Sequence, residues 1–234
     1  LSYALMKERI RVLLIARDAD PRDYYDALTR NEADLSLAQS YGRGIAQLYG
    51  GDAAAAVKSL RRLHDEYPEV LAFHTALGQA QLSAGDTDGA LRTLEHAREL
   101  APRNVPVTVR YGEALLQAGR PKRAHEVLLD LFNNVPPTQD QIRLTAIAAN
   151  AAGDVADAYS YMAEYHLMGG DLMLAINQLE LALSVPGINE QQRSKFVARL
   201  KEIREWLPKE RNRSRPPGEQ SPSGQRSPGL TCLL

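Results

Sequence analysis

The sequence predicts an all-α fold in which antiparallel helix pairs stack into an array. Ala and Leu are abundant, whereas Phe is present three times and Trp once, and this composition favours helix over strand. With 234 residues, of which 44% are hydrophobic, the chain is long enough to bury a sizeable core. The third observation is a spacing. Gly-Asp or Gly-Arg pairs begin at residues 51, 85, 119 and 153, a constant interval of 34 residues that indicates an internal repeat.

Three further classes of residue recur in phase with these pairs. Alanines follow each pair, small residues precede it, and prolines close three of the units. The positions are Ala56, Ala90, Ala124 and Ala158; Gly44, Gly78, Gly112 and Ala146; and Pro68, Pro102 and Pro136. Four classes of position in register indicate that each unit has the same local structure.

Each class of position has a physical role in a pair of antiparallel helices. A Gly or Ala at the eighth place of a unit, with an Ala at the twentieth, lets the two helices approach closely where they cross. The Gly of each pair tolerates the left-handed conformation that ends the first helix, and an Asp after it suits the start of the second. The proline ends the second helix because it has no backbone N–H.

The best-formed unit reads LGQAQLSAGDTDGALRTLEHARELAP at residues 77–102. It resembles the tetratricopeptide repeat, whose period and small-residue pattern it shares. The resemblance implies a right-handed solenoid of helix pairs. It divides the array into copies at residues 37–70, 71–104, 105–138 and 139–172.

The array is expected to span residues 37–186 and to be irregular near its end. Gly170-Asp171 follows Gly153 by half a period. The helix expected over residues 155–168 therefore serves both as the second helix of one unit and as the first of the next, with a half-repeat overlap over 156–186.

The flanking segments are predicted as follows. Residues 1–36 hold two short helices, at 3–16 and 21–30, that precede or cap the array, and the second begins after Asp20 with a proline in its first turn. Residues 187–208 form a long amphipathic helix with charges on its outer face, which keeps the end of a solenoid soluble. Residues 209–234 are rich in Pro, Ser, Gly and Arg, and we expect them to be a disordered tail.

Charge and composition exclude several classes of function. The net charge is −1, and the tail at 209–234 carries a surplus of Lys and Arg, so the rest of the chain is weakly acidic. Such a field is too weak to predict nucleic acid as a partner. The chain has no apolar run of about 18 residues, which a transmembrane segment needs. The single Cys232 excludes an internal disulfide.

The sequence shows no catalytic or metal-binding constellation. HEVLL begins at His125 and nearly matches the HExxH zinc motif, but Leu129 takes the place of the second histidine. The other histidines are expected in different helices, as ordinary surface or half-buried residues. They are His64, His74, His96 and His166. We therefore predict that this chain is not an enzyme by itself and that it binds neither a metal nor another cofactor.

The predicted binding site is the concave face of the array. The resemblance implies that places 2, 5, 9, 12 and 13 of each first helix point into it. Those residues are Tyr41, Ile45, Leu48, Tyr49, Thr75, Gln79, Leu82, Ser83, Val109, Glu113, Leu116, Gln117, Arg143, Ile147 and Asn150. Their mixed polar and apolar character suits an extended or helical segment of another protein. The alternative for Ile45, Leu48, Leu82 and Leu116 is that they only pack between helices.

The order of parts also resembles the C-terminal half of the bacterial β-barrel assembly-enhancing protease family, periplasmic zinc metallopeptidases. Three stretches carry this likeness: LSYALMKERIRVLL, SYGRGIAQLYGGDAAAAVKSLRRL and INEQQRSKFVARLKEIREWLP. The resemblance implies a zinc peptidase domain upstream of Leu1. It also implies a periplasmic location and docking to the outer-membrane assembly machinery or to misassembled barrel proteins. The alternatives are a freestanding scaffold of another assembly or export complex and, with less support, a self-contained enzyme.

Overall fold

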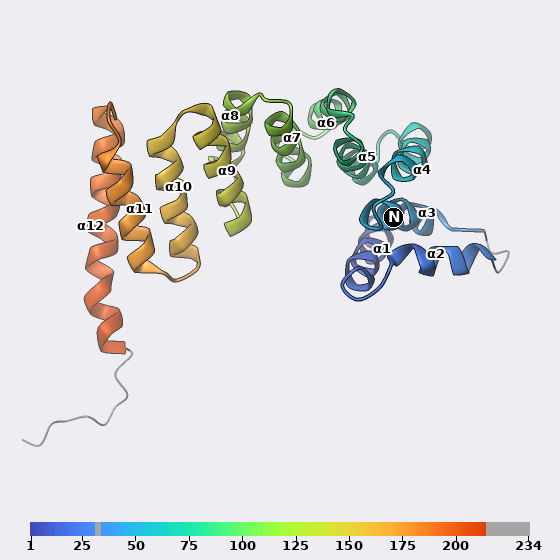
Figure 1. Cartoon of the computed structure of the whole chain (residues 1–234), viewed down its shortest axis with the longest axis horizontal. Coiled ribbons are helices and arrows are strands. Elements are labelled where there is room, and N and C mark those ends of the chain that lie inside the picture. Colours follow the sequence, from blue (N-terminus) through green and yellow to red (C-terminus); the bar gives the residue numbers. More distant parts are fainter. Residues whose placement is uncertain (31–33, 214–234) are drawn as a thin grey trace, which may run out of the picture.

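The computed structural model describes residues 1–30 and 34–213, and within these ranges the chain forms twelve α-helices and no strand. The helices follow one another along an arch, with α1 and α2 at one end and α12 at the other (Figure 1). Their bounds are α1 Ser2–Ile15, α2 Pro21–Arg30, α3 Leu37–Tyr49, α4 Ala53–Glu66, α5 Leu71–Ser83, α6 Thr87–Leu100, α7 Val105–Gln117, α8 Pro121–Phe132, α9 Gln139–Ala152, α10 Val155–Met168, α11 Leu172–Ser184 and α12 Glu190–Arg213. The predicted all-α class is confirmed.

The repeated Gly-Asp pair forms the turn within each helix pair. Gly85 has a φ of 81°, a left-handed conformation that glycine adopts without steric cost. The Asp86 carboxylate then accepts a hydrogen bond of 2.9 Å from the Gly89 N–H and caps α6. Asp52 and Asp171 cap α4 and α11 in the same way. The two residues of the pair therefore end one helix and begin the next.

The small residue at the eighth place makes room for a leucine of the second helix. A Cβ added to Gly78 would lie 2.6 Å from Leu94 Cγ, closer than two carbon atoms can approach. Gly44 and Gly112 face Leu60 and Leu128 in the same manner. The sequence argument paired the eighth place with the alanine at the twentieth. The structure adds that the atoms nearest to each glycine belong to the leucine four residues after that alanine, and the alanines Ala56, Ala90 and Ala124 are themselves fully buried.

The half-period break near residue 170 ends a helix with the same backbone conformation as the earlier turns. Gly170 has a φ of 80°, like the other glycines that end helices. The helix before it, α10, packs against both α9 and α11. Helix α10 therefore has a neighbour on each side, as α4, α6 and α8 do, and the array continues through α11 to α12.

The last helix is longer than the sequence analysis predicted. It extends from Glu190 to Arg213, so residues 209–213 are helical and the expected start of the tail is wrong. Pro208 lies within this helix and has no N–H to donate, whereas the Lys, Glu and Arg residues after it are good helix formers. Residues 214–234 of the expected tail, Cys232 included, lie outside the described residues.

The first two helices close the N-terminal end of the array. Leu5 and Val12 of α1 belong to the same buried cluster as Tyr25 of α2 and Tyr41 and Ile45 of α3. Helix α1 therefore packs across α3.

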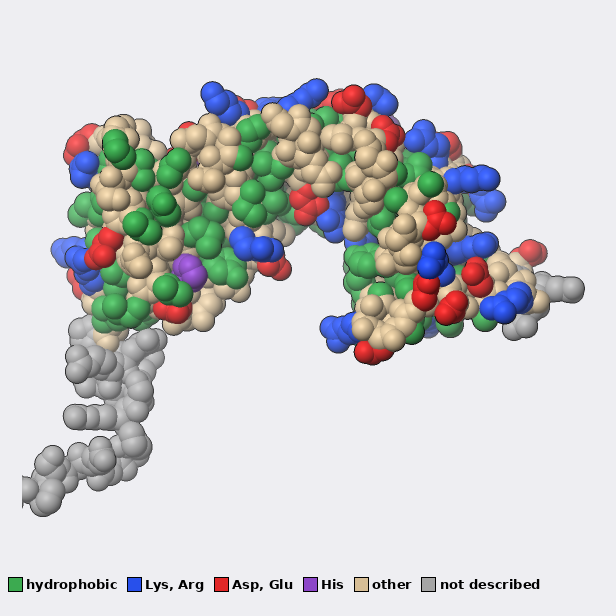
Figure 2. Space-filling model, viewed as in Figure 1, with side chains coloured by type: hydrophobic (Ala, Val, Ile, Leu, Met, Phe, Trp, Pro, Cys, Tyr) green, Lys and Arg blue, Asp and Glu red, His purple; other side chains and the backbone are tan. Residues whose placement is uncertain are grey.

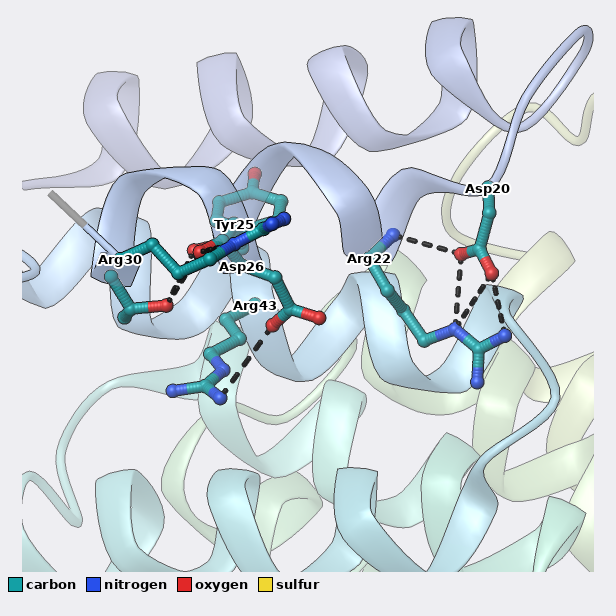
Figure 3. A network of polar contacts seen from close by, with 7 residues as sticks. Asp20, Arg22, Tyr25, Asp26, Arg30 and Arg43 are labelled. Atoms are coloured by element: carbon teal, nitrogen blue, oxygen red, sulfur yellow. Dashed lines mark hydrogen bonds and ion pairs between the residues drawn. The ribbon is translucent and has the colours of Figure 1, made fainter.

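Helix α2 is attached to α3 and to its own start by polar contacts at the surface (Figure 3). Asp20 accepts hydrogen bonds from the Arg22 backbone and guanidinium, which lower the pKa of the Asp20 carboxyl. Asp26 of α2 lies 3.8 Å from the guanidinium of Arg43 on α3.

None of the helices in the described part of the chain combines the length and apolar character that crossing a membrane requires.

Candidate protein-binding site

A cleft lies on the concave side of the arch, between α1 and the first helices of the second and third repeats. Its volume is about 680 Å³. Figure 2 shows the hollow beneath the arch, with hydrophobic and charged side chains on its walls. Most of the lining side chains are apolar, among them Leu5, Met6, Val70, Leu71, Val105, Pro106 and Val109. The cleft therefore offers an apolar floor to a partner segment.

Helix α1 forms one wall of this cleft because it lies across α3. The Arg9 guanidinium donates hydrogen bonds to the Tyr41 hydroxyl at 3.2 Å and to Gln79 Oε1 at 3.4 Å. These two acceptors lie on α3 and α5, so Arg9 bridges the first two repeats. Arg9 also lines the cleft, and both of its acceptors are neutral.

The position of α1 corrects the predicted site at its N-terminal end. Ile45 is fully buried and does not reach the cleft, whereas Tyr41, although only 2% exposed, lines it as expected. Ile45 is buried because Leu5 and Val12 of α1 pack in the same cluster. A helix outside the four repeats therefore covers Ile45, which the first repeat was expected to contribute to the face.

Three other predicted residues meet on the cleft, namely Thr75 from α5 and Val109 and Glu113 from α7. The remaining predicted residues do not line it: Leu48, Tyr49, Gln79, Leu82, Ser83, Leu116, Gln117, Arg143, Ile147 and Asn150. Among these, Leu48, Leu82 and Leu116 are half-buried and pack against the core clusters. This agrees with the alternative in which they only pack between helices. Ile147 is 49% exposed. A binding role for the exposed members stays a prediction.

The sequence analysis did not predict the cleft residues that come from α1 and from the starts of α5 and α7. Leu1, Leu5, Met6 and Arg9 come from the N-terminal segment, which was expected only to precede or cap the array. One signal was available in the sequence. Helix α1 is apolar on two opposite sides, and a helix with two apolar sides needs more than one partner.

The charges on the cleft wall opposite α1 largely compensate one another. Arg110 and Glu113, one turn apart on α7, form an ion pair of 2.7 Å, and Glu69 lies at the end of the cleft near the start of α5. The wall opposite α1 therefore carries no surplus of positive charge.

The histidines contact one another and neighbouring polar or aromatic groups. His74 is fully buried between His64 and His96, with ring centroids 4.4 and 5.5 Å away. Its Nε2 lies 2.6 Å from the Pro68 carbonyl oxygen, and burial lowers its pKa. In the ranges 1–30 and 34–213, no group of three or more His, Cys, Asp or Glu residues is arranged to hold a metal ion.

The histidine of the HEVLL stretch links two repeats. His125 Nδ1 lies 3.0 Å from an Asp154 carboxylate oxygen, and its Nε2 lies 3.2 Å from the Tyr161 hydroxyl. Burial is the main cause that raises the pKa of Tyr161 to about 12, so the phenol keeps its proton. Asp154, which binds this histidine, is the one Asp of the Gly-Asp pairs that does not cap its helix within the described residues.

Comparison with known proteins agrees with this geometry. The model of the tetratricopeptide repeat family matches residues 48–99 and 81–147. The fold is a tetratricopeptide-repeat solenoid. Two similar solved structures are described as MamA, from AMB-1 and MSR-1. They share 21% and 19% identity with this chain, with TM-scores of 0.54 and 0.52, and cover 70% and 71% of this chain and 98% and 97% of their own.

A third similar structure is a tetratricopeptide repeat protein from Parabacteroides merdae. It shares 14% identity, covers 86% of this chain and 84% of its own length, and gives a TM-score of 0.51. No curated protein matches the sequence. At these identities the structural likeness concerns the tetratricopeptide-repeat fold alone.

Proposed function

We propose that this chain is a non-catalytic protein-interaction scaffold that binds a segment of a partner protein in the cleft between α1, α5 and α7. The observation that carries the proposal is the cleft of about 680 Å³ with mainly apolar walls on the concave side of the solenoid. Exposed apolar surface of this kind in a folded protein marks an interaction site. The tetratricopeptide-repeat fold supports the same class of function, because stacked helix pairs present extended concave surfaces.

A helical or extended protein segment suits the cleft better than a small molecule. Its walls come from three helices and it is open along the arch, whereas sites for small molecules enclose most of the ligand surface. The polar groups on its walls, such as Thr75 and the Arg110–Glu113 pair, are spread along the cleft rather than convergent. Such walls suit a chain with alternating apolar and polar side chains.

Selection of a displayed library of random peptides on the full chain tests this function. We expect the selected peptides to lose at least about tenfold in affinity for Val109→Glu, because a charge in the apolar cleft must be desolvated on binding. The matched control is Leu100→Glu, which introduces the same charge on α6 at a side chain that is 51% exposed and outside the cleft lining. Selected peptides that bind Val109→Glu and the wild type equally would overturn the proposal.

We further propose that the scaffold is the docking arm of an envelope zinc metallopeptidase. The three stretches that resemble the β-barrel assembly-enhancing protease family support this role. The proposed partners are then the outer-membrane assembly machinery or misassembled barrel proteins, in the periplasm, and zinc would belong to a peptidase domain upstream.

The natural reading frame before Leu1 separates this role from its alternative. An upstream peptidase domain with an HExxH motif is expected for the docking arm. A signal peptide or lipoprotein start directly before Leu1 is expected for a freestanding scaffold, and the absence of HExxH would remove the metallopeptidase proposal while leaving the scaffold function intact.

A further inference from the structure

The outward side of α1 carries a stripe of exposed apolar side chains. The stripe consists of Tyr3, Met6, Ile10, Leu13 and Leu14, which are between 38% and 82% exposed. Their spacing of three and four residues places them on one side of the helix. The opposite side holds Leu5 and Val12, which are buried in the N-terminal cluster. Helix α1 therefore has one apolar side within the core and a second that no described residue covers.

Positive charges border this stripe on both sides. At 3.6 residues per turn, Lys7 and Arg11 lie along one edge and Arg9 along the other. The only carboxylate within α1 is Glu8, which is buried, accepts a hydrogen bond of 2.8 Å from the Tyr25 hydroxyl and pairs with Arg11. Lys7 and Arg9 form no ion pair with a carboxylate in the described part of the chain.

We propose that the α1 stripe docks an amphipathic helix of another protein, one whose apolar side is flanked by Asp or Glu. The spacing of Tyr3, Met6, Ile10 and Leu13 is that of a seam between two packed helices. Acidic residues beside the partner's apolar side would meet Lys7 and Arg9, and complementary charge favours such an encounter.

The stripe adjoins the cleft, because Met6 belongs to the stripe and to the cleft lining. The inference therefore rests on the proposed scaffold function and adds the chemistry of the partner. A partner helix on the stripe has α1 beneath it and the apolar residues Val105, Pro106 and Val109 across the cleft from Met6.

Charge and shape argue against the two other occupants of an exposed apolar helix side. A second copy of this chain would bring its own Lys7 and Arg9 against the same cations, which repel. An anionic membrane would satisfy the charges, but a flat surface does not enter the cleft that α7 forms beside Met6. A helix fits both the stripe and the edge of the cleft.

A displayed library of helical peptides provides the test. Each peptide matches the 14 residues of α1 in length, has a fixed apolar side, and carries Glu, Gln or Lys at the flanking positions. We expect selection on the full chain to enrich Glu over Lys at these positions. Ile10→Ser should weaken the selected peptides by at least about tenfold, as for a central interface residue. Leu100→Ser, the same change at an exposed residue of α6, should leave their affinity unchanged.

Charge reversal tests the electrostatic part separately. The double variant Lys7→Glu, Arg9→Glu should reverse the enrichment from Glu to Lys. Arg11 is kept because it pairs with the buried Glu8. Thermal melting, monitored by circular dichroism, checks that each variant is folded. The single variant Lys7→Glu, at an exposed residue, should shift the enrichment from Glu toward Lys in the same direction but by less.

The outcomes separate this inference from the proposed function. If selected helices lose affinity for Val109→Glu but not for Ile10→Ser, binding in the cleft stands and docking on the stripe is overturned. Peptides selected without preference for Glu overturn the acidic partner. The inference is also wrong if no helix is selected and Ile10→Ser abolishes another association of the wild type. Loss of dimerisation would identify a second copy as the occupant, and loss of binding to phosphatidylglycerol vesicles would identify a membrane.

Discussion

The centre of the array and its N-terminal end are stabilised by different kinds of contact. In the array, the first helices of the first three repeats carry a glycine that faces a leucine of the second helix, as Gly78 faces Leu94. At the N-terminal end, α1 and α2 are not a repeat, and their interior includes the buried Glu8 and Tyr25, joined by a hydrogen bond of 2.8 Å.

The difference follows from the number of neighbours that each helix has. A helix inside the array packs against an equivalent unit on either side, so repeated small and large residues fill the space. The first repeat has no preceding unit, and α1 crosses α3 in its place. A crossing helix brings different side chains together, and a buried carboxylate is tolerated there because Tyr25 and Arg11 bind it.

The largest effect is expected for removal of a central leucine. Leu94→Ala removes a fully buried side chain over Gly78 and should lower the free energy of unfolding by about 2 to 5 kcal/mol. Chemical denaturation measures the change. Leu100→Ala, on the same helix but 51% exposed, should change it by no more than about 0.5 kcal/mol. A similar loss in both variants would contradict the glycine-leucine packing.

A smaller effect is expected at the N-terminal end. Tyr25→Phe removes the hydroxyl that donates to the buried Glu8 and should cost about 1 to 3 kcal/mol, the range for a buried group that loses its hydrogen-bond partner. Tyr3→Phe, at a side chain that is 82% exposed, is the matched control. If Tyr25→Phe unfolds at the same denaturant concentration as the wild type, the polar interior does not stabilise this end.

The stability of the second repeat, which contains the buried His74, should respond to pH. The pKa of His74 is lowered in the folded protein, chiefly by burial, so the unfolded chain binds a proton at a higher pH than the folded one. The neutral His74 therefore contributes fully to the free energy of unfolding above the ordinary histidine pKa of about 6.5. As the pH falls below that value, this contribution is lost by at most about 1.4 kcal/mol per pH unit. Chemical denaturation at pH 7.5 and pH 5.5, which lie about one unit on either side of that value, measures the free energy of unfolding under both conditions. We expect this free energy to differ less between the two pH values for His74→Phe than for the wild type. An equal difference would assign the pH dependence to other groups.

The smallest effect is expected for the surface contact between α2 and α3. The Asp26–Arg43 pair is 3.8 Å long, with side chains 53% and 41% exposed. Pairs of this kind contribute about 0 to 1 kcal/mol because water and salt screen them. Asp26→Asn should therefore leave the unfolding midpoint nearly unchanged, and its small effect should disappear in high salt. If Asp26→Asn lowered the free energy of unfolding as much as Tyr25→Phe, surface ion pairs would contribute substantially to the stability of the N-terminal end.

The sequence by itself determined the repeat, because its turns and packing are local. Gly85 and Asp86 end one helix and cap the next through contacts within a few residues. Each glycine-leucine contact likewise joins residues of a single unit. The helix class and the repeated breaks were therefore predictable, whereas the end of α12 was misplaced because good helix formers extend a helix beyond its last apolar contact.

Only the tertiary structure decided which residues form the cleft. Ile45 occupies a place that was expected to face the groove, yet it is fully buried because α1 lies on it, whereas Tyr41 still lines the cleft. No period relates α1 to the repeats, so its crossing of α3 is set by long-range packing rather than by local pattern. The same packing places Arg9 between Tyr41 and Gln79, which are 32 and 70 residues away in sequence, and leaves the second apolar side of α1 at the surface.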